Sequence, residues 1–250
     1  MEESQDESES AYLQRYDSRN YPSPLVTVDV VIFAVIDDAL NVLLVKRGGH
    51  PEKGKWALPG GFVRVEEDRD LEAAALRRLR QETGVETPYL EQVATFGDGQ
   101  RDARGWSLTV VTMALIDAAS ANFSSGETVQ ETRWSAVEHC ADLTLAFDHA
   151  RLLEAAVQRL RAKVEYTALP IHLMPEAFTL SELQRVFEIV LGRRVEKASF
   201  RRRIREASIL EAIPGEKRRG SNRPAQLYRV VEGEGAHFFP RTLTGRRGAS

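Results

Sequence analysis

The sequence contains a single cysteine, Cys140, among its 250 residues. One cysteine excludes an internal disulfide and any zinc module built from several cysteines, and it suits a reducing compartment. No run of about 18 apolar residues is present, which excludes a membrane-spanning helix and predicts no membrane partner. The opening MEESQDESES lacks the basic and apolar regions of a Sec-type signal peptide. Together these absences predict a cytoplasmic protein.

Charge is unevenly distributed along the chain, although the net charge is only −3. Residues 168–250 hold 16 Lys and Arg against 9 Asp and Glu, whereas residues 1–167 hold 18 against 28. Opposite signs predict two domains with different partners, and the basic part indicates contact with phosphate backbones. A solvated surface that happens to carry arginines would give the same composition, so charge alone leaves both interpretations open.

Residues 1–22 are acidic, rich in serine and poor in periodic apolar positions, which predicts a disordered tail. Apolar patterns after them predict strands and helices in alternation. Strands are predicted at 26–36, 41–46, 90–96, 107–116 and 131–135, and helices at 68–82 and 147–166. This order indicates an α+β or α/β sandwich that extends to about residue 165.

The C-terminal part has the element order of a winged helix-turn-helix. Thr179 and Glu182 form a capping-box pattern, and the apolar helix that follows ends at Gly192. A basic helix is predicted at 196–207, then strands at 209–213 and 226–231 around a Gly/Pro-rich basic loop at 214–225. Helix, short turn, basic helix and hairpin in this order predict a DNA-binding domain.

A glycine-rich turn and the helix after it carry a recognisable motif. Residues 56–63 (WALPGGFV) and 77–85 (RRLRQETGV) resemble the Nudix box, G-x5-E-x7-R-E-U-x-E-E-x-G-U, where U is aliphatic. The box glutamates lie on one helical face and offer Mg²⁺ hard oxygen ligands. Here Arg78 and Gln81 replace two of them, Glu82 remains, and two extra residues separate Glu67 from Arg77. These departures predict a domain with no metal site, no catalytic residue and no enzyme activity.

Such a domain can still bind an anion without a metal. Arg101 and Arg104, between two predicted strands, can hold phosphates through bidentate hydrogen bonds. Arg47, at the end of a predicted strand, lies either at the rim of the site or in contact with the ligand, and the sequence does not decide between the two. The candidate ligand-binding residues are Arg47, Gly60, Gly61, Glu67, Arg77, Arg78, Gln81, Glu82, Arg101 and Arg104.

The basic helix and the hairpin form a second candidate site. Guanidinium forks match guanine edges and phosphates, so arginines on a groove-facing helix indicate DNA reading. The candidate DNA-binding residues are Thr179, Lys197, Ser199, Arg201, Arg202, Arg203, Arg205, Lys217, Arg218, Arg219 and Arg223. A charged solvated helix is the alternative, which the preceding apolar helix and following hairpin make weaker.

Residues 25–232 resemble the NAD-related Nudix transcriptional regulators, the NrtR family. The resemblance rests on MPEAFTLSELQRVFEIVLGR (174–193), FRRRI (200–204), RPAQLYR (223–229), and FGD with RDARGW (96–106). It implies a Nudix-like α/β/α sandwich at residues 23–166, a winged helix-turn-helix domain at 167–235 and a basic tail at 236–250.

The resemblance also implies a function. Family members repress genes of NAD synthesis, bind palindromic operators in double-stranded DNA as homodimers, and are released by ADP-ribose. We therefore expect a nucleoid-associated repressor that needs no cofactor and takes ADP-ribose as its nucleotide effector. Two alternatives stay open: an active ADP-ribose pyrophosphatase whose basic domain anchors it to nucleic acid, and a non-catalytic protein-interaction adaptor.

Overall fold

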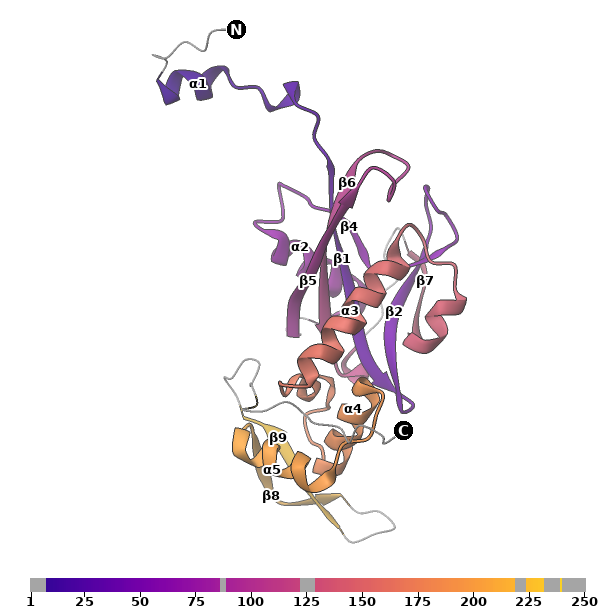
Figure 1. Cartoon of the computed structure of the whole chain (residues 1–250), viewed down its shortest axis with the longest axis vertical. Coiled ribbons are helices and arrows are strands. Elements are labelled where there is room, and N and C mark those ends of the chain that lie inside the picture. Colours follow the sequence, from indigo (N-terminus) through magenta and orange to yellow (C-terminus); the bar gives the residue numbers. More distant parts are fainter. Residues whose placement is uncertain (1–7, 86–88, 122–128, 219–223, 232–238, 240–250) are drawn as a thin grey trace, which may run out of the picture.

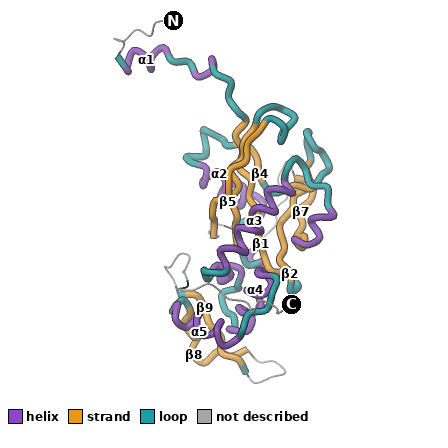
Figure 2. Tube along the Cα trace, viewed as in Figure 1, coloured by secondary structure: helices purple, strands orange, loops and turns teal. Residues whose placement is uncertain are grey.

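The structure, a computed structural model, describes residues 8–85, 89–121, 129–218, 224–231 and Phe239. Figure 1 shows an elongated molecule with a sheet and its helices in the middle and a smaller unit of helices and a hairpin at one end. Figure 2 shows the same arrangement by element type. Among the described residues, no helix is both long and apolar enough to cross a bilayer.

The central sheet has the order β3–β2–β1–β6–β5, with β4 paired to β1 and β7 paired to β2. The strands are β1 Leu25–Ile36, β2 Ala39–Arg47, β3 Trp56–Ala57, β4 Gly60–Phe62, β5 Tyr89–Asp98, β6 Ser107–Leu115 and β7 Val129–Ala136. β1 and β6 run parallel and the other pairs antiparallel. The five predicted strands are confirmed, whereas β3 and β4 are too short to show a sequence pattern.

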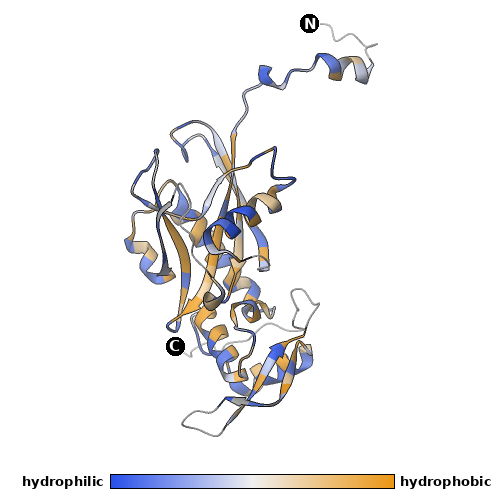
Figure 3. Ribbon diagram, turned by 180° about the vertical axis from the view of Figure 1, so that it is seen from behind, coloured by the Kyte–Doolittle hydropathy of each residue, from blue (hydrophilic) through white to orange (hydrophobic). Residues whose placement is uncertain are grey.

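Both faces of β1 are buried, because a helix covers each side of the sheet. Ile32 shares an apolar cluster with Leu79 of α2 (Leu71–Thr83), whereas Phe33 shares another with Leu152 of α3 (His149–Val164). Successive side chains of a strand point to opposite faces, which explains the split. Figure 3 shows the hydrophobic residues concentrated along these central strands. This arrangement confirms the α/β/α sandwich.

The ends of the two covering helices follow from their boundary residues. Asp70 caps α2 by accepting a hydrogen bond from the Ala73 backbone N–H (2.7 Å), and Gly84 ends it in the left-handed conformation (φ 68°). The sequence predicts that the second covering helix, α3, begins at residue 147. Phe147 has a φ of 51°, which a right-handed helix does not allow, so α3 begins two residues later.

The winged helix unit consists of α4 Leu180–Leu191, α5 Lys197–Ala207, β8 Leu210–Arg218 and β9 Ala225–Val230. The rings of Phe187 in α4 and Phe200 in α5 pack edge to face at 5.2 Å. β8 continues through part of the predicted loop, because a register shift with Gly215 (φ 77°) accommodates the extra residues without ending the pairing.

The boundary between the two units is itself packed. The connection forms a 3-10 turn, η4 Leu169–Leu173, and one apolar cluster runs from Phe33 of the sheet to Phe187 and Phe200. Phe239, predicted to lie in a basic tail, is buried against Phe187 instead. The rest of 236–250 lies outside the described residues. A shared core means that movement in one unit is felt in the other.

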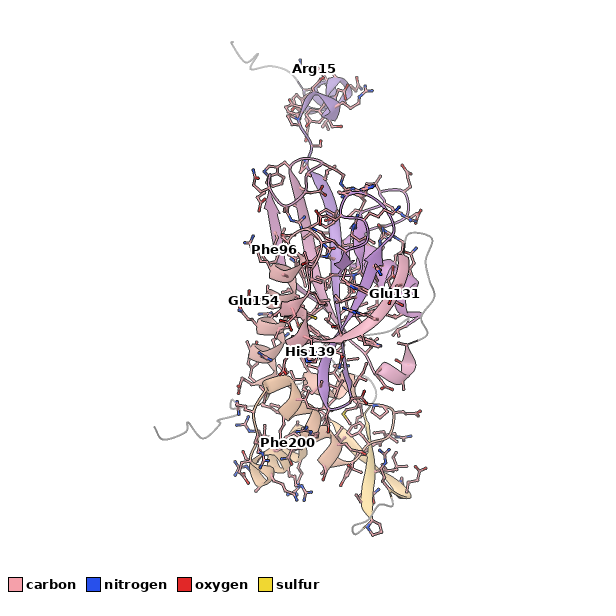
Figure 4. The ribbon with its side chains drawn as sticks, turned by 90° about the vertical axis from the view of Figure 1, so that its right-hand side faces the viewer. Arg15, Phe96, Glu131, His139, Glu154 and Phe200 are labelled. Atoms are coloured by element: carbon pink, nitrogen blue, oxygen red, sulfur yellow. The ribbon has the colours of Figure 1, made fainter. Side chains whose placement is uncertain are left out.

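The N-terminal segment was predicted to be disordered, but its described residues include a short helix. Glu9–Arg15 form helix α1, with Ser8 as its N-cap and no buried residue. It projects away from the sheet, and Figure 4 shows its Arg15 at the end of the molecule opposite Phe200. Short 3-10 turns also occur at η1 Ser18–Asn20, η2 Ala118–Ser120 and η3 Val137–Asp142.

Candidate functional sites

A pocket of about 250 Å³ opens where β1, β2 and β4 meet the start of α3. The predicted ligand residues that line it are Arg47, Gly60, Gly61, Arg78, Arg101 and Arg104. The predicted ligand residues Glu67, Arg77 and Gln81 line a separate groove on the outer face of α2. Glu82 is buried one helical turn from Arg78 and is not part of the pocket wall. The structure therefore brings six of the ten candidates together.

Arg77 has a structural partner in this arrangement. Its guanidinium makes two hydrogen bonds to the buried carboxylate of Asp68, Nε to Oδ1 at 2.7 Å and Nη2 to Oδ2 at 2.6 Å. Hydrogen bonding to Arg77 lowers the pKa of Asp68 to about 2. The pair ties the loop after β4 to α2 and places Arg77 outside the pocket, so its contact with a ligand stays a prediction.

Arg78 occupies the position where the Nudix pattern has a glutamate. A Cβ atom on Gly61 would lie 2.1 Å from the Arg78 Nη2, so this glycine lets the guanidinium lie against the backbone. Burial and the nearby Arg77 lower the Arg78 pKa, and Nε has no hydrogen-bond partner among the described residues. A half-buried cation therefore faces the pocket.

The residues at this position do not fit a magnesium ion. Glu82 remains on the inner face of α2, but burial raises its pKa and Oε2 has no partner among the described residues. Arg78, one turn away, would repel a cation. No group of three or more metal-binding side chains occurs in the part of the chain that the structure describes. Arg78 places positive charge at a position where the Nudix pattern has a carboxylate.

The pocket arginines differ in how they are paired. Arg101 binds Asp148 through Nε–Oδ2 (3.1 Å) and Nη2–Oδ1 (2.9 Å), and Arg104 holds Asp102 in the same forked manner. Arg47 donates instead to the Pro51 carbonyl at 3.0 Å. Within the described residues, Arg47 and Arg78 have no carboxylate partner. These two are the cations with capacity left for an anionic ligand.

The second site is the outer face of α5. Glu196 caps this helix by accepting hydrogen bonds from the backbone of Ala198 (2.8 Å) and Ser199 (2.6 Å). Phe200 and Ile204 face inward as predicted, which leaves a basic outer surface. The exposed basic side chains are Lys197, Arg201, Arg202 and Arg205, with Ser199 half-buried beside them.

Arg203 was predicted to contact DNA, and the structure corrects this. It is only 9% exposed, and its guanidinium lies 5.9 Å from the Phe239 ring centroid. Burial lowers its pKa. Arg203 is the residue after the exposed Arg202, and on a helix this step directs its side chain toward the core. Arg203 therefore packs between α5 and Phe239.

The hairpin candidates are only partly described. Arg218 forms an ion pair with Glu182 and donates to the Ala177 carbonyl at 3.2 Å, which ties β8 to the start of α4. The Lys217 side chain and the whole of Arg219 and Arg223 lie outside the described residues. Contact of these three with DNA stays a prediction.

Thr179 has a capping role in the structure. Its hydroxyl accepts from the Glu182 backbone N–H (3.2 Å), while the Glu182 carboxylate accepts from the Thr179 N–H (2.7 Å). Thr179→Ala is expected to lower the melting temperature by about 2–4 °C, because an N-cap stabilises by about 1 kcal/mol. Ser181→Ala, exposed in the same first turn, is the control. An unchanged melting temperature with weakened DNA binding would instead restore Thr179 as a DNA contact.

The polar residues around the pocket that sequence reasoning missed include Asp29, Asp148 and His149. Asp29 and His149 line the pocket, and Asp148 binds Arg101. A signal for Asp29 was present, since it is a charged residue inside the apolar run VTVDVVIFAVI. No local pattern placed the start of α3 beside the glycine-rich turn.

Comparison with known proteins agrees with this architecture. Residues 26–156 match the NUDIX domain, and residues 170–230 match the NrtR DNA-binding winged helix domain. The ADPR responsive transcriptional repressor NtrR of Acinetobacter baylyi is 48% identical over 236 residues, which is 94% of each chain.

Solved structures are similar over nearly the same range. Shewanella oneidensis NrtR complexed with a 27mer DNA matches with a TM-score of 0.80 and 40% identity, covering 88% of this chain and 99% of that one. The NUDIX domain of the same protein complexed with ADP ribose matches with a TM-score of 0.58 and 42% identity, covering 62% and 99%. The chain belongs to the NrtR family, whose members join a NUDIX domain to a DNA-binding winged helix domain.

Proposed function

We propose that this chain is a transcriptional repressor of NAD-synthesis genes that ADP-ribose releases from a palindromic operator. The observation that carries the proposal is the separation of two basic surfaces on one shared apolar core. One is a pocket whose metal position is taken by Arg78, and the other is the outer face of α5. The Acinetobacter relative is named an ADPR responsive repressor, which supports this effector.

The pocket suits a diphosphate that is bound and not hydrolysed. Arg47 and Arg78 supply the positive charge that a pyrophosphate needs, and guanidinium groups bind phosphate oxygens through forked hydrogen bonds. Hydrolysis in Nudix enzymes requires carboxylates that hold Mg²⁺. Arg78 and Gln81 replace two of these, so the domain serves as a sensor without turnover or a required cofactor.

Helix α3 connects the pocket to the DNA-binding unit. At its start, Asp148 is held by Arg101 of the pocket. At its other end, Arg161 donates to the Val190 carbonyl of α4 (3.2 Å), and Glu165 pairs with Arg193 (2.6 Å) in the turn before α5. A helix of 16 residues is about 24 Å long. Displacement at the pocket end therefore reaches the turn that positions α5 (Figure 1).

DNA binding by this unit requires a second copy of the chain. A homodimer presents two α5 helices, and a palindrome with half-sites about 34–36 Å apart receives them in successive major grooves. ADP-ribose favours a geometry in which this spacing is lost, because a ligand shifts the population toward the state that it binds better.

The proposal is tested by fluorescence anisotropy of a labelled palindrome from an NAD-synthesis promoter, with and without ADP-ribose. We expect tight binding at about 100 mM salt, a steep decrease with log[salt], and release at saturating ADP-ribose. A parallel assay with Mg²⁺ is expected to detect no cleavage of ADP-ribose. Clear turnover without specific DNA binding would replace the regulator with a hydrolase, and unchanged DNA affinity would refute the effector.

A further inference from the structure

The floor of the pocket carries a buried carboxylate, unlike its arginine-rich walls. Asp29 lies on the central strand β1 and is only 5% exposed. Its Oδ2 accepts a hydrogen bond from the Thr109 hydroxyl at 2.8 Å, and the Arg101 Nη2 lies 4.0 Å away. No hydrogen-bond donor among the described residues reaches Oδ1. The carboxylate is therefore fixed in orientation with one oxygen free.

His149 places a donor beside that free oxygen. Its Nδ1 accepts a hydrogen bond from the Leu58 backbone N–H at 2.9 Å, so in the neutral ring the proton is on Nε2. Burial lowers the His149 pKa and keeps the ring neutral. Nε2 lies 3.7 Å from the Asp29 Oδ1, which is longer than an N–H···O hydrogen bond. An acceptor and a donor thus face the pocket together without satisfying each other.

We propose that Asp29 and His149 form a subsite for the hydroxyl groups of the sugar at the far end of the effector. A hydroxyl donates to the Asp29 Oδ1 and accepts from the His149 Nε2–H, which satisfies both groups at once. This inference rests on the proposed function, in which the ligand is a nucleotide sugar. It assigns the specificity for the sugar to the floor and the affinity for the diphosphate to the arginines.

Charge and shape exclude the other parts of the ligand from the floor. A phosphate would meet the Asp29 carboxylate in a poorly solvated position, where repulsion is strong. A flat surface suited to a base lies at the mouth, where Arg104 stacks over the exposed Phe62 ring at 4.9 Å. The Phe147 ring near His149 is already covered by the Arg47 guanidinium at 4.8 Å. Gly60 keeps the floor open, because a Cβ there would lie 2.1 Å from the Asp29 Oδ1.

The test compares ADP-ribose with ADP, which lacks the terminal sugar, by titration calorimetry on the full chain. The wild-type protein is expected to bind ADP-ribose at least about tenfold more tightly than ADP. Only ADP-ribose has the sugar hydroxyl that donates to the charged Asp29, and a hydrogen bond to a charged group is strong enough to account for most of this difference in affinity. In Asp29→Asn the two affinities are expected to fall within about threefold of each other, with ADP affinity unchanged or higher.

Asp102→Asn is the matched control, because it neutralises the pocket carboxylate that binds Arg104 at the mouth. It alters both affinities together and keeps the preference for ADP-ribose. Thr109→Val is the second variant, since it leaves the Asp29 charge but removes the hydrogen bond that orients it; an intermediate preference is expected. Circular dichroism and melting temperature verify that each variant is folded.

The outcomes separate this inference from the proposed function. If Asp29→Asn weakens ADP and ADP-ribose equally, or if the wild-type protein does not distinguish them, the sugar subsite is refuted while the nucleotide effector stands. If the wild-type protein binds neither nucleotide, the proposed effector itself is refuted, and the subsite with it.

Discussion

Replacing Arg201 and Arg205 together by alanine is expected to weaken operator binding at least about 30-fold, since each lost phosphate or base contact costs about 1–3 kcal/mol. The two side chains are one helical turn apart on the exposed face of α5. Neither has a carboxylate partner among the described residues, so both guanidinium groups are available to DNA. The inward Phe200 and Ile204 are untouched, which predicts little change in stability.

Anisotropy at several salt concentrations measures this effect and identifies its origin. A lost phosphate contact lowers the slope of log K against log[salt] by about one, whereas a lost base contact lowers affinity without that change. The control is Arg69→Ala with Arg80→Ala, which removes the same charge from exposed positions around α2. If the control weakens binding as much as the α5 variant does, the effect is general electrostatics and α5 is not the reading helix.

The elements of the fold that the sequence predicts are those whose pattern lies in residues close together along the chain. The continuous apolar runs of β1 and β2, the apolar stripe of α2 and the Thr179 capping box all follow from neighbouring residues. Helix α1 and strands β3 and β4 were missed because each is too short to carry a periodicity. The extension of β8 past Pro214 depends on its partner strand, which no local pattern contains.

The Nudix-like helix divides the candidate ligand residues between two faces, which the motif alone did not predict. Residues three and four apart are neighbours on a helix, so spacing groups position 81 with both 77 and 78, and the structure decides that it turns outward with 77. The motif assigned functional meaning to all four. The structure keeps Arg78 at the pocket and places Arg77 and Gln81 in the outer groove.

Some side-chain partners are determined by contacts between distant parts of the chain, which local patterns do not contain. The Arg203 side chain is covered by Phe239, which is 36 residues later in a segment without periodicity. The partner of Arg101 is Asp148, 47 residues away. A basic helix viewed alone exposes every arginine that is not on its apolar stripe, so only the tertiary structure separates Arg203 from its neighbours.

The second large effect is expected for Arg78→Glu, which restores the carboxylate of the Nudix pattern. In metal-free buffer, the ADP-ribose dissociation constant should rise at least about 100-fold, because reversing a charge near a diphosphate costs several kcal/mol at low effective dielectric. The new carboxylate would lie one turn from Glu82, and two such groups supply ligands for Mg²⁺. Excess Mg²⁺ is therefore expected to recover at least about tenfold of the lost affinity.

The ADP-ribose affinity of the wild-type protein, by contrast, should not depend on Mg²⁺ and should be the same in excess Mg²⁺ and in a chelator. The Arg78 guanidinium already supplies the positive charge. Arg80→Glu is the matched control: it makes the same substitution two positions along α2 at an exposed residue, and it should leave affinity nearly unchanged in both buffers. Equal losses in the two variants would show a long-range charge effect. A wild-type protein that needs Mg²⁺ to bind ADP-ribose would mean that the ligand displaces Arg78 and that the guanidinium does not substitute for the metal.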